Sequence, residues 1–124
     1  MAERATAITK ITHVYDLGGT PARVNRRTGE MFLCIPQLKK LPKEHRLFIM
    51  LHEMAHVVLQ TENEGEADAW AFAKYAEMGY SLKASVHALT DTLKAQFPQH
   101  YMRMWQQLQR AEKYDREVNH NTKF

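Results

Sequence analysis

The chain has 124 residues, of which 44% are hydrophobic and 25% are charged. This length and composition suit one domain, residues 1–124, with a core that needs no cross-links. The formal net charge of +3 is spread over short basic runs, so we do not expect nucleic acid as a partner.

The chain also lacks the features of an exported or membrane-bound protein. Its single cysteine, Cys34, excludes an internal disulfide and favours a reducing compartment. We find no signal peptide and no apolar stretch near the roughly 20 residues that a membrane span needs. The expected location is therefore the cytoplasm, with no membrane partner.

The N-terminal third, residues 1–41, is predicted to consist of strands and loops. Mixed β-branched and aromatic residues predict strands at 8–17, 22–26 and 30–35. Gly29 lies between the last two strands and provides the positive φ of a hairpin turn. We therefore predict a small antiparallel sheet.

Residues 42–114 show helical periodicity, which predicts about four helices. They cover about 43–60, 64–78, 81–95 and 98–114. Pro42 has the fixed φ of a first helical turn, and Gly79 suits the position after a helix end. The predicted fold class is therefore α+β, with the sheet before the helices.

The last predicted helix has an apolar face, and the residues after it have few apolar groups. Tyr101, Trp105 and Leu108 follow each other at spacings of four and three, so we expect them to be buried. Residues 115–124 are expected to form a flexible tail.

The first predicted helix contains His52, Glu53 and His56 within an apolar run. Because the two histidines are four apart, their imidazoles lie one turn apart on the same face and can converge on one ion. Glu53 lies about 100° around the helix, where it can reach a water without being a ligand. This H-E-x-x-H arrangement combines two zinc ligands with a general base.

A catalytic zinc usually takes three protein ligands, so a third donor is expected from the acidic start of the next helix. Glu64 and Asp68 are four apart and share one face, and only seven residues separate His56 from Glu64. The two helices should therefore be antiparallel neighbours. We prefer Glu64 as the ligand, with Asp68 accepting the second N–H of an imidazole. If the second helix simply mirrors the first about so short a turn, Asp68 lies nearly opposite His52 and His56. Asp68 therefore stays the alternative ligand.

Residues 52–73 resemble the gluzincin superfamily of zinc peptidases, in which H-E-x-x-H is followed by E-x-x-x-D on a later helix. The run EGEADAWAFA at 64–73 is similar to the E-x-E-A-[ND]-x-F-A signature of the ImmA/IrrE group of small bacterial and phage metallopeptidases. The resemblance implies a minimal zincin-like domain that acts on a peptide or protein substrate. It also implies Zn²⁺ held by His52, His56 and Glu64, with Glu53 as the catalytic base and Asp68 in a supporting position.

Two functions therefore follow from the sequence. The first is a zinc-dependent metallopeptidase, in which a further group stabilises the oxyanion, with Tyr75, Tyr80 and His87 as candidates. The alternative is a catalytically limited zinc-binding interaction or regulatory module of phage or mobile-element origin, which the short chain favours. In the alternative, four protein ligands close the zinc site, and chelation unfolds the domain.

Overall fold

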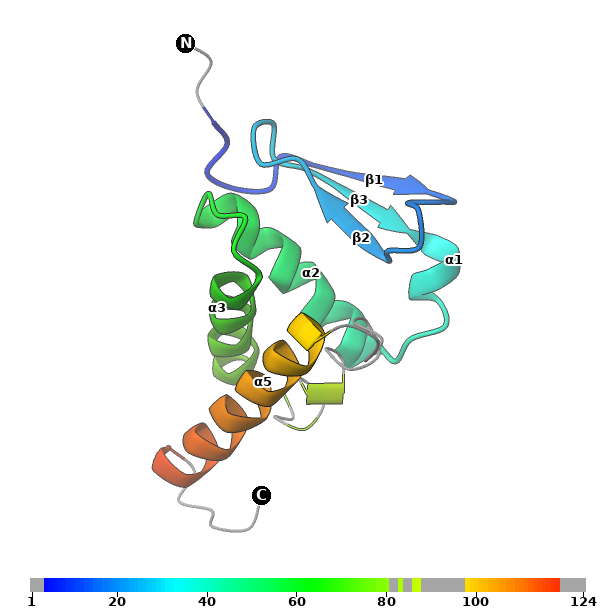
Figure 1. Ribbon diagram of the computed structural model, residues 1–124. Coiled ribbons are helices and arrows are strands. Elements are labelled where there is room, and N and C mark those ends of the chain that lie inside the picture. The colour runs from blue at the N-terminus through cyan, green and yellow to red at the C-terminus, as the bar shows by residue number, and fades with distance from the viewer. Residues whose placement is uncertain (1–3, 81–82, 84–85, 88–97, 119–124) are drawn as a thin grey trace.

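The computed structural model describes residues 4–80, 83, 86–87 and 98–118 (Figure 1). A small sheet precedes the helices, so the α+β class predicted from the sequence is confirmed. The strands are β1 (Lys10–Val14), β2 (Ala22–Val24) and β3 (Glu30–Cys34). The helices are α1 (Ile35–Leu38), α2 (Lys43–Val58), α3 (Glu64–Glu77) and α5 (Pro98–Glu117).

The sheet is mixed, so the prediction of an antiparallel sheet is wrong. The strand order is β1-β3-β2, with β1 parallel to β3 and β2 antiparallel to it. Met31, Leu33 and Cys34 make β3 the most buried strand, and it takes the central position where both edges are covered. The segment between β1 and β2 therefore passes the end of β3, and β2 lies at the edge of the sheet.

Only β2 and β3 form the predicted hairpin, and their turn depends on Gly29. The φ of Gly29 is +79°, which is in the left-handed region. A Cβ atom there would lie 2.5 Å from the carbonyl oxygen of Ala7. Glycine is therefore required both by the backbone conformation and by the segment that precedes β1.

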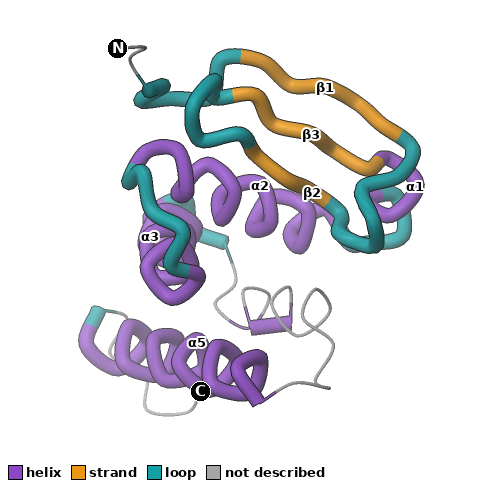
Figure 2. The backbone as a smooth tube through the Cα atoms, turned by 45° about the horizontal axis from the view of Figure 1, so that its top comes forward, coloured by secondary structure: helices purple, strands orange, loops and turns teal. Residues whose placement is uncertain are grey.

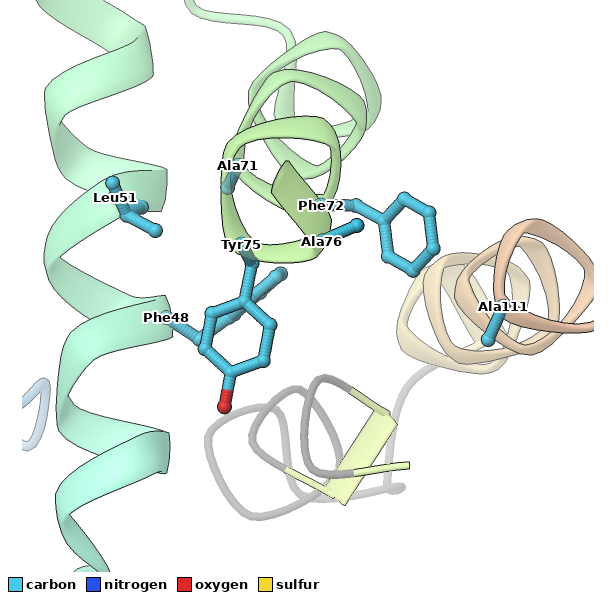
Figure 3. Packing of buried hydrophobic residues seen from close by; sticks show 7 residues of the cluster. All are labelled: Phe48, Leu51, Ala71, Phe72, Tyr75, Ala76 and Ala111. Carbon is cyan, nitrogen blue, oxygen red and sulfur yellow. The ribbon is translucent and has the colours of Figure 1, made fainter. Parts of the chain in front are cut away.

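Helix α2 is the central element, because it packs against both the sheet and α3 (Figure 2). The cluster between sheet and helix consists of Ala22, Met31, Leu33, Leu38 and Ile49. The cluster on the other side consists of Phe48, Leu51, Ala71, Phe72, Tyr75, Ala76 and Ala111 (Figure 3). Full burial of one large apolar side chain contributes roughly 1.5–3 kcal/mol, so these two clusters supply much of the packing that positions α2.

The helix boundaries mostly follow the sequence signals. Helices α2 and α3 begin at the predicted residues, and the side chain of Asn63 caps α3 by accepting a bond from the N–H of Glu66 at 2.9 Å. The short helix α1 occupies part of a predicted loop. The helix predicted at 81–95 falls largely outside the described residues.

Helix α5 differs from its prediction in both length and orientation. It continues to Glu117, and Asp115 is buried, so residues 115–117 belong to the helix and not to a tail. Trp105 was predicted to be buried but is 54% exposed, and Gln107 and Ala111 face the core instead. Across the described part of the chain, no helix combines the length and the hydropathy of a membrane span.

Candidate metal centre

Three potential ligands meet where α2 and α3 face each other. The Nε2 atoms of His52 and His56 are 3.1 Å apart, as expected for side chains one helical turn apart. Glu64 opens α3, and its Oε1 lies 2.9 Å from Nε2 of His56. Its Oε2 lies 3.4 Å from Nε2 of His52. The donor atoms all lie within 4.8 Å of one another, so this group could hold a metal ion.

The turn between the helices fixes the orientation of His56. Gln60 has a φ of +49°, which ends the helix sharply and brings Thr61 back over it. The carbonyl oxygen of Thr61 lies 2.8 Å from Nδ1 of His56. Nδ1 therefore donates to this carbonyl oxygen, and Nε2 is the ring nitrogen that faces Glu64.

Gln60 also ties this turn to the rest of the molecule. Its side-chain amide donates to the carbonyl oxygens of Ala5, Arg26 and Val57, at 2.9, 2.8 and 3.0 Å. The N-terminal segment, the hairpin and the end of α2 thus meet at one side chain. These bonds hold the carbonyl that orients His56.

Asp68 lies one turn beyond Glu64 on α3 and is fully buried. Its Oδ1 is 2.8 Å from Nδ1 of His52, the nitrogen that faces away from Glu64. Of the two acids that the sequence left as alternative ligands, Glu64 therefore faces the Nε2 atoms and Asp68 faces the back of the first imidazole. With an oxygen opposite each Nδ1, both Nε2 atoms are available to one ion.

Sequence reasoning missed Arg103, which reaches the centre from α5. Its Nε and Nη2 lie 2.8 and 2.9 Å from the two carboxylate oxygens of Asp68. Its Nη1 lies 3.0 Å from Oε2 of Glu64. A fully buried carboxylate is costly unless it is paired, and this guanidinium is the partner.

A signal for this contact exists in the sequence of α5. Arg103, Gln107 and Arg110 follow each other at spacings of four and three, so they form a polar stripe on one face. The guanidinium turns that face toward α3, which leaves Trp105 on the exposed side. Pairing with the acids of α3 and packing of Ala111 on the core thus agree on one rotation of the helix.

Hydrogen bonding outweighs burial at His52, Asp68 and Glu64. Burial lowers the pKa of His52, but bonds to Asp68 and Glu64 raise it to about 9. Burial raises the pKa of Asp68, but bonds to Arg103 and His52 bring it below its usual value. Burial also raises the pKa of Glu64, whereas bonds from His52 and His56 bring it well below the ordinary range. Asp68 and Glu64 are therefore anionic at neutral pH, and a cation that binds here competes with imidazole protons.

Glu53 lies beside the ligands and borders a cleft of about 320 Å³. His56 and Glu64 line the same cleft, and three consecutive residues of β2 form its other wall. Burial raises the pKa of Glu53, although the nearby imidazoles partly oppose this. A carboxylate with a raised pKa next to open space is suited to accept a proton.

The residues considered for oxyanion stabilisation lie at the other end of α2. Tyr75 is fully buried, and its hydroxyl donates to the carbonyl oxygen of Glu44 at 3.2 Å. Eight residues, or about 12 Å of helix, separate that carbonyl from the first histidine of the motif. The ring of Tyr80 is 5.0 Å from that of Tyr75, and the ring of His87 is 6.4 Å from that of His45. None of the three candidates therefore belongs to the metal centre.

Comparisons of the chain with protein-family models, curated proteins and solved structures find no match. The resemblance to gluzincins therefore stays a prediction based on the motif.

Proposed function

We propose that this protein is a zinc-dependent metallopeptidase. The observation that supports this most strongly is a three-donor group with a neighbouring carboxylate and an open cleft. Among the described residues, the group contains His52, His56 and Glu64 and no fourth histidine, cysteine or acid. Three protein ligands leave a coordination position for water, which is typical of catalytic zinc and not of structural zinc.

The residues of the centre have separate roles in this proposal. His52, His56 and Glu64 would hold Zn²⁺, which their nitrogen and oxygen donors suit. When bound, the ion polarises the scissile carbonyl and lowers the pKa of water toward ~7. Glu53 would accept a proton from the attacking water and deliver it to the leaving amine.

The position of β2 supports a peptide as the substrate. One side of β2 pairs with β3, and no other described strand pairs with it. Ala22, Arg23 and Val24 line the same cleft as Glu53, so an edge strand borders the proposed centre. An extended peptide can pair with such an edge through main-chain hydrogen bonds.

Replacement of Glu53 by glutamine tests this proposal. We expect Glu53→Gln to keep one zinc per chain while hydrolysis of a peptide library, followed by mass spectrometry, falls by about 10²–10⁴-fold. Glu66→Gln is the matched control, because Glu66 is an exposed acid on α3 and should leave the rate unchanged.

Two outcomes would contradict the proposal. One is a Glu53→Gln variant that cleaves at the rate of the wild type. The other is a zinc-loaded wild type that cleaves nothing in the library, which would favour the zinc-binding regulatory module.

A further inference from the structure

We infer that Arg103 is a positioning residue of the metal centre, which limits Glu64 to one ligating oxygen and orients Asp68 against His52. This inference rests on the proposed function, because it concerns the same centre. It adds a residue from a helix that the H-E-x-x-H motif does not include.

The contacts of Arg103 involve three nitrogens of one planar group. Nε and Nη2 face the two oxygens of Asp68 at 2.8 and 2.9 Å, and Nη1 faces Oε2 of Glu64 at 3.0 Å. The side chain is only 14% exposed. A paired contact of this kind fixes direction as well as charge, which a lysine does not reproduce.

The contact with Glu64 affects how this residue can bind an ion. Oε2 lies 3.0 Å from Nη1 of Arg103 and 3.4 Å from Nε2 of His52, whereas Oε1 lies 2.9 Å from Nε2 of His56. Because the guanidinium pairs with Oε2, Oε1 is the oxygen that we assign to the metal. A carboxylate that used both oxygens would fill the position that hydrolysis needs for water.

The contact with Asp68 affects the first imidazole. Because Arg103 takes both carboxylate oxygens, Asp68 cannot rotate away from Nδ1 of His52, 2.8 Å from Oδ1. A partner of this kind fixes the tautomer and the ring plane of a ligating histidine. The guanidinium thus acts on two of the three ligands.

Charge balance supports the same role. Glu53, Glu64 and Asp68 lie around the centre, and Arg103 is the cation from α5 that pairs with two of them. The guanidinium therefore offsets part of the negative charge that Glu64 and Asp68 bring to the centre.

Two variants separate orientation from charge. Arg103→Lys keeps the charge but loses the paired contact, and Arg103→Met loses both. We expect both to weaken zinc binding by about 10–100-fold in a competition titration with a chelator, the usual effect of losing such a partner. Rescue of affinity by the lysine variant would overturn the positioning role, because charge alone would then suffice.

The matched control is Arg110→Met on the same helix. Arg110 donates to Gln107 at 2.9 Å and to the carbonyl oxygen of Gly65 at 3.3 Å and contacts no predicted ligand. Its zinc affinity should stay within about threefold of the wild type.

Coordination geometry gives a second readout that does not depend on activity. We expect cobalt-substituted wild type to show the intense visible absorption of a four-coordinate ion and both Arg103 variants to lose intensity as Glu64 binds with two oxygens. If a variant fails to fold, a crystal structure of zinc-bound wild type decides the question. Both oxygens of Glu64 on the ion would overturn the inference. A wild type that binds no metal would instead refute the proposed function.

Discussion

The free energy of unfolding should depend strongly on Asp68, even without metal. Asp68 is fully buried and lies within 2.9 Å of two nitrogens of Arg103 and one of His52. Asp68→Ala removes the acceptor of Nε and Nη2 of Arg103 and the partner of Nδ1 of His52, and loss of one member of a buried pair costs about 3–5 kcal/mol. Total stability for a domain of this kind is about 5–15 kcal/mol, so the effect should be large.

Urea unfolding in the presence of a chelator measures this effect, with the fluorescence of Trp70 and Trp105 as the signal. With a slope of about 2 kcal/mol per molar urea, the midpoint should fall by roughly 1.5–2.5 M. Glu66→Ala removes an equal charge from the exposed side of α3 and is the control. The reasoning would be refuted if Asp68→Ala stayed within about 1 kcal/mol of that control.

A double replacement tests the cause of the loss. Asp68→Leu with Arg103→Met removes both charges and fills the space with apolar groups, which is often neutral for stability. We expect the double variant to recover most of the stability that Asp68→Ala loses. If the double variant loses as much free energy of unfolding as the two single variants added together, the two side chains act independently.

Three further predictions concern the rest of the molecule. Chelation should leave the far-ultraviolet circular dichroism unchanged, because the apolar clusters hold α2 without the ion; unfolding on chelation would indicate structural zinc. Burial raises the pKa of Tyr75 from 10.0 to about 12. The folded state therefore favours the protonated phenol. Its contribution to the free energy of unfolding is complete below pH 10 and is lost as the pH rises to 12. Tyr75→Phe should abolish this part of the alkaline loss, and a wild type whose phenols all ionise near pH 10 while folded would contradict the burial argument. Gly29→Ala should lower the melting temperature more than Gly18→Ala, because both have positive φ but only Gly29 has atoms within 4 Å of an added Cβ. Equal losses would mean that backbone strain, about 1–2 kcal/mol at each site, is the whole effect.

The parts of the centre that the sequence predicts are those that depend on local geometry. His52 and His56 converge because helical periodicity alone places residues four apart on one face. Glu64 lies beside them because the short turn between α2 and α3 restricts α3 to positions next to α2. For the two histidines, spacing along the chain was sufficient information, whereas for the third donor it only limited the choice to the first acids of α3.

The parts that could not be predicted depend on packing between distant elements. The choice between Glu64 and Asp68 depends on the rotation of α3 against α2, which spacing does not determine. The parallel pairing of β1 depends on a connection that crosses the end of β3. Arg103 lies 35 residues beyond Asp68. It pairs from a face of α5 that lies toward α3, whereas apolar periodicity alone predicted that the face with Trp105 is buried.

Elemental analysis of the purified protein tests the central claim most directly. We predict about one equivalent of zinc per wild-type chain and less than about a tenth of that for His52→Ala and for Glu64→Ala, with Glu53→Gln at the wild-type level. A wild type free of bound metal, or variants that keep a full equivalent, would contradict a centre built from these three side chains.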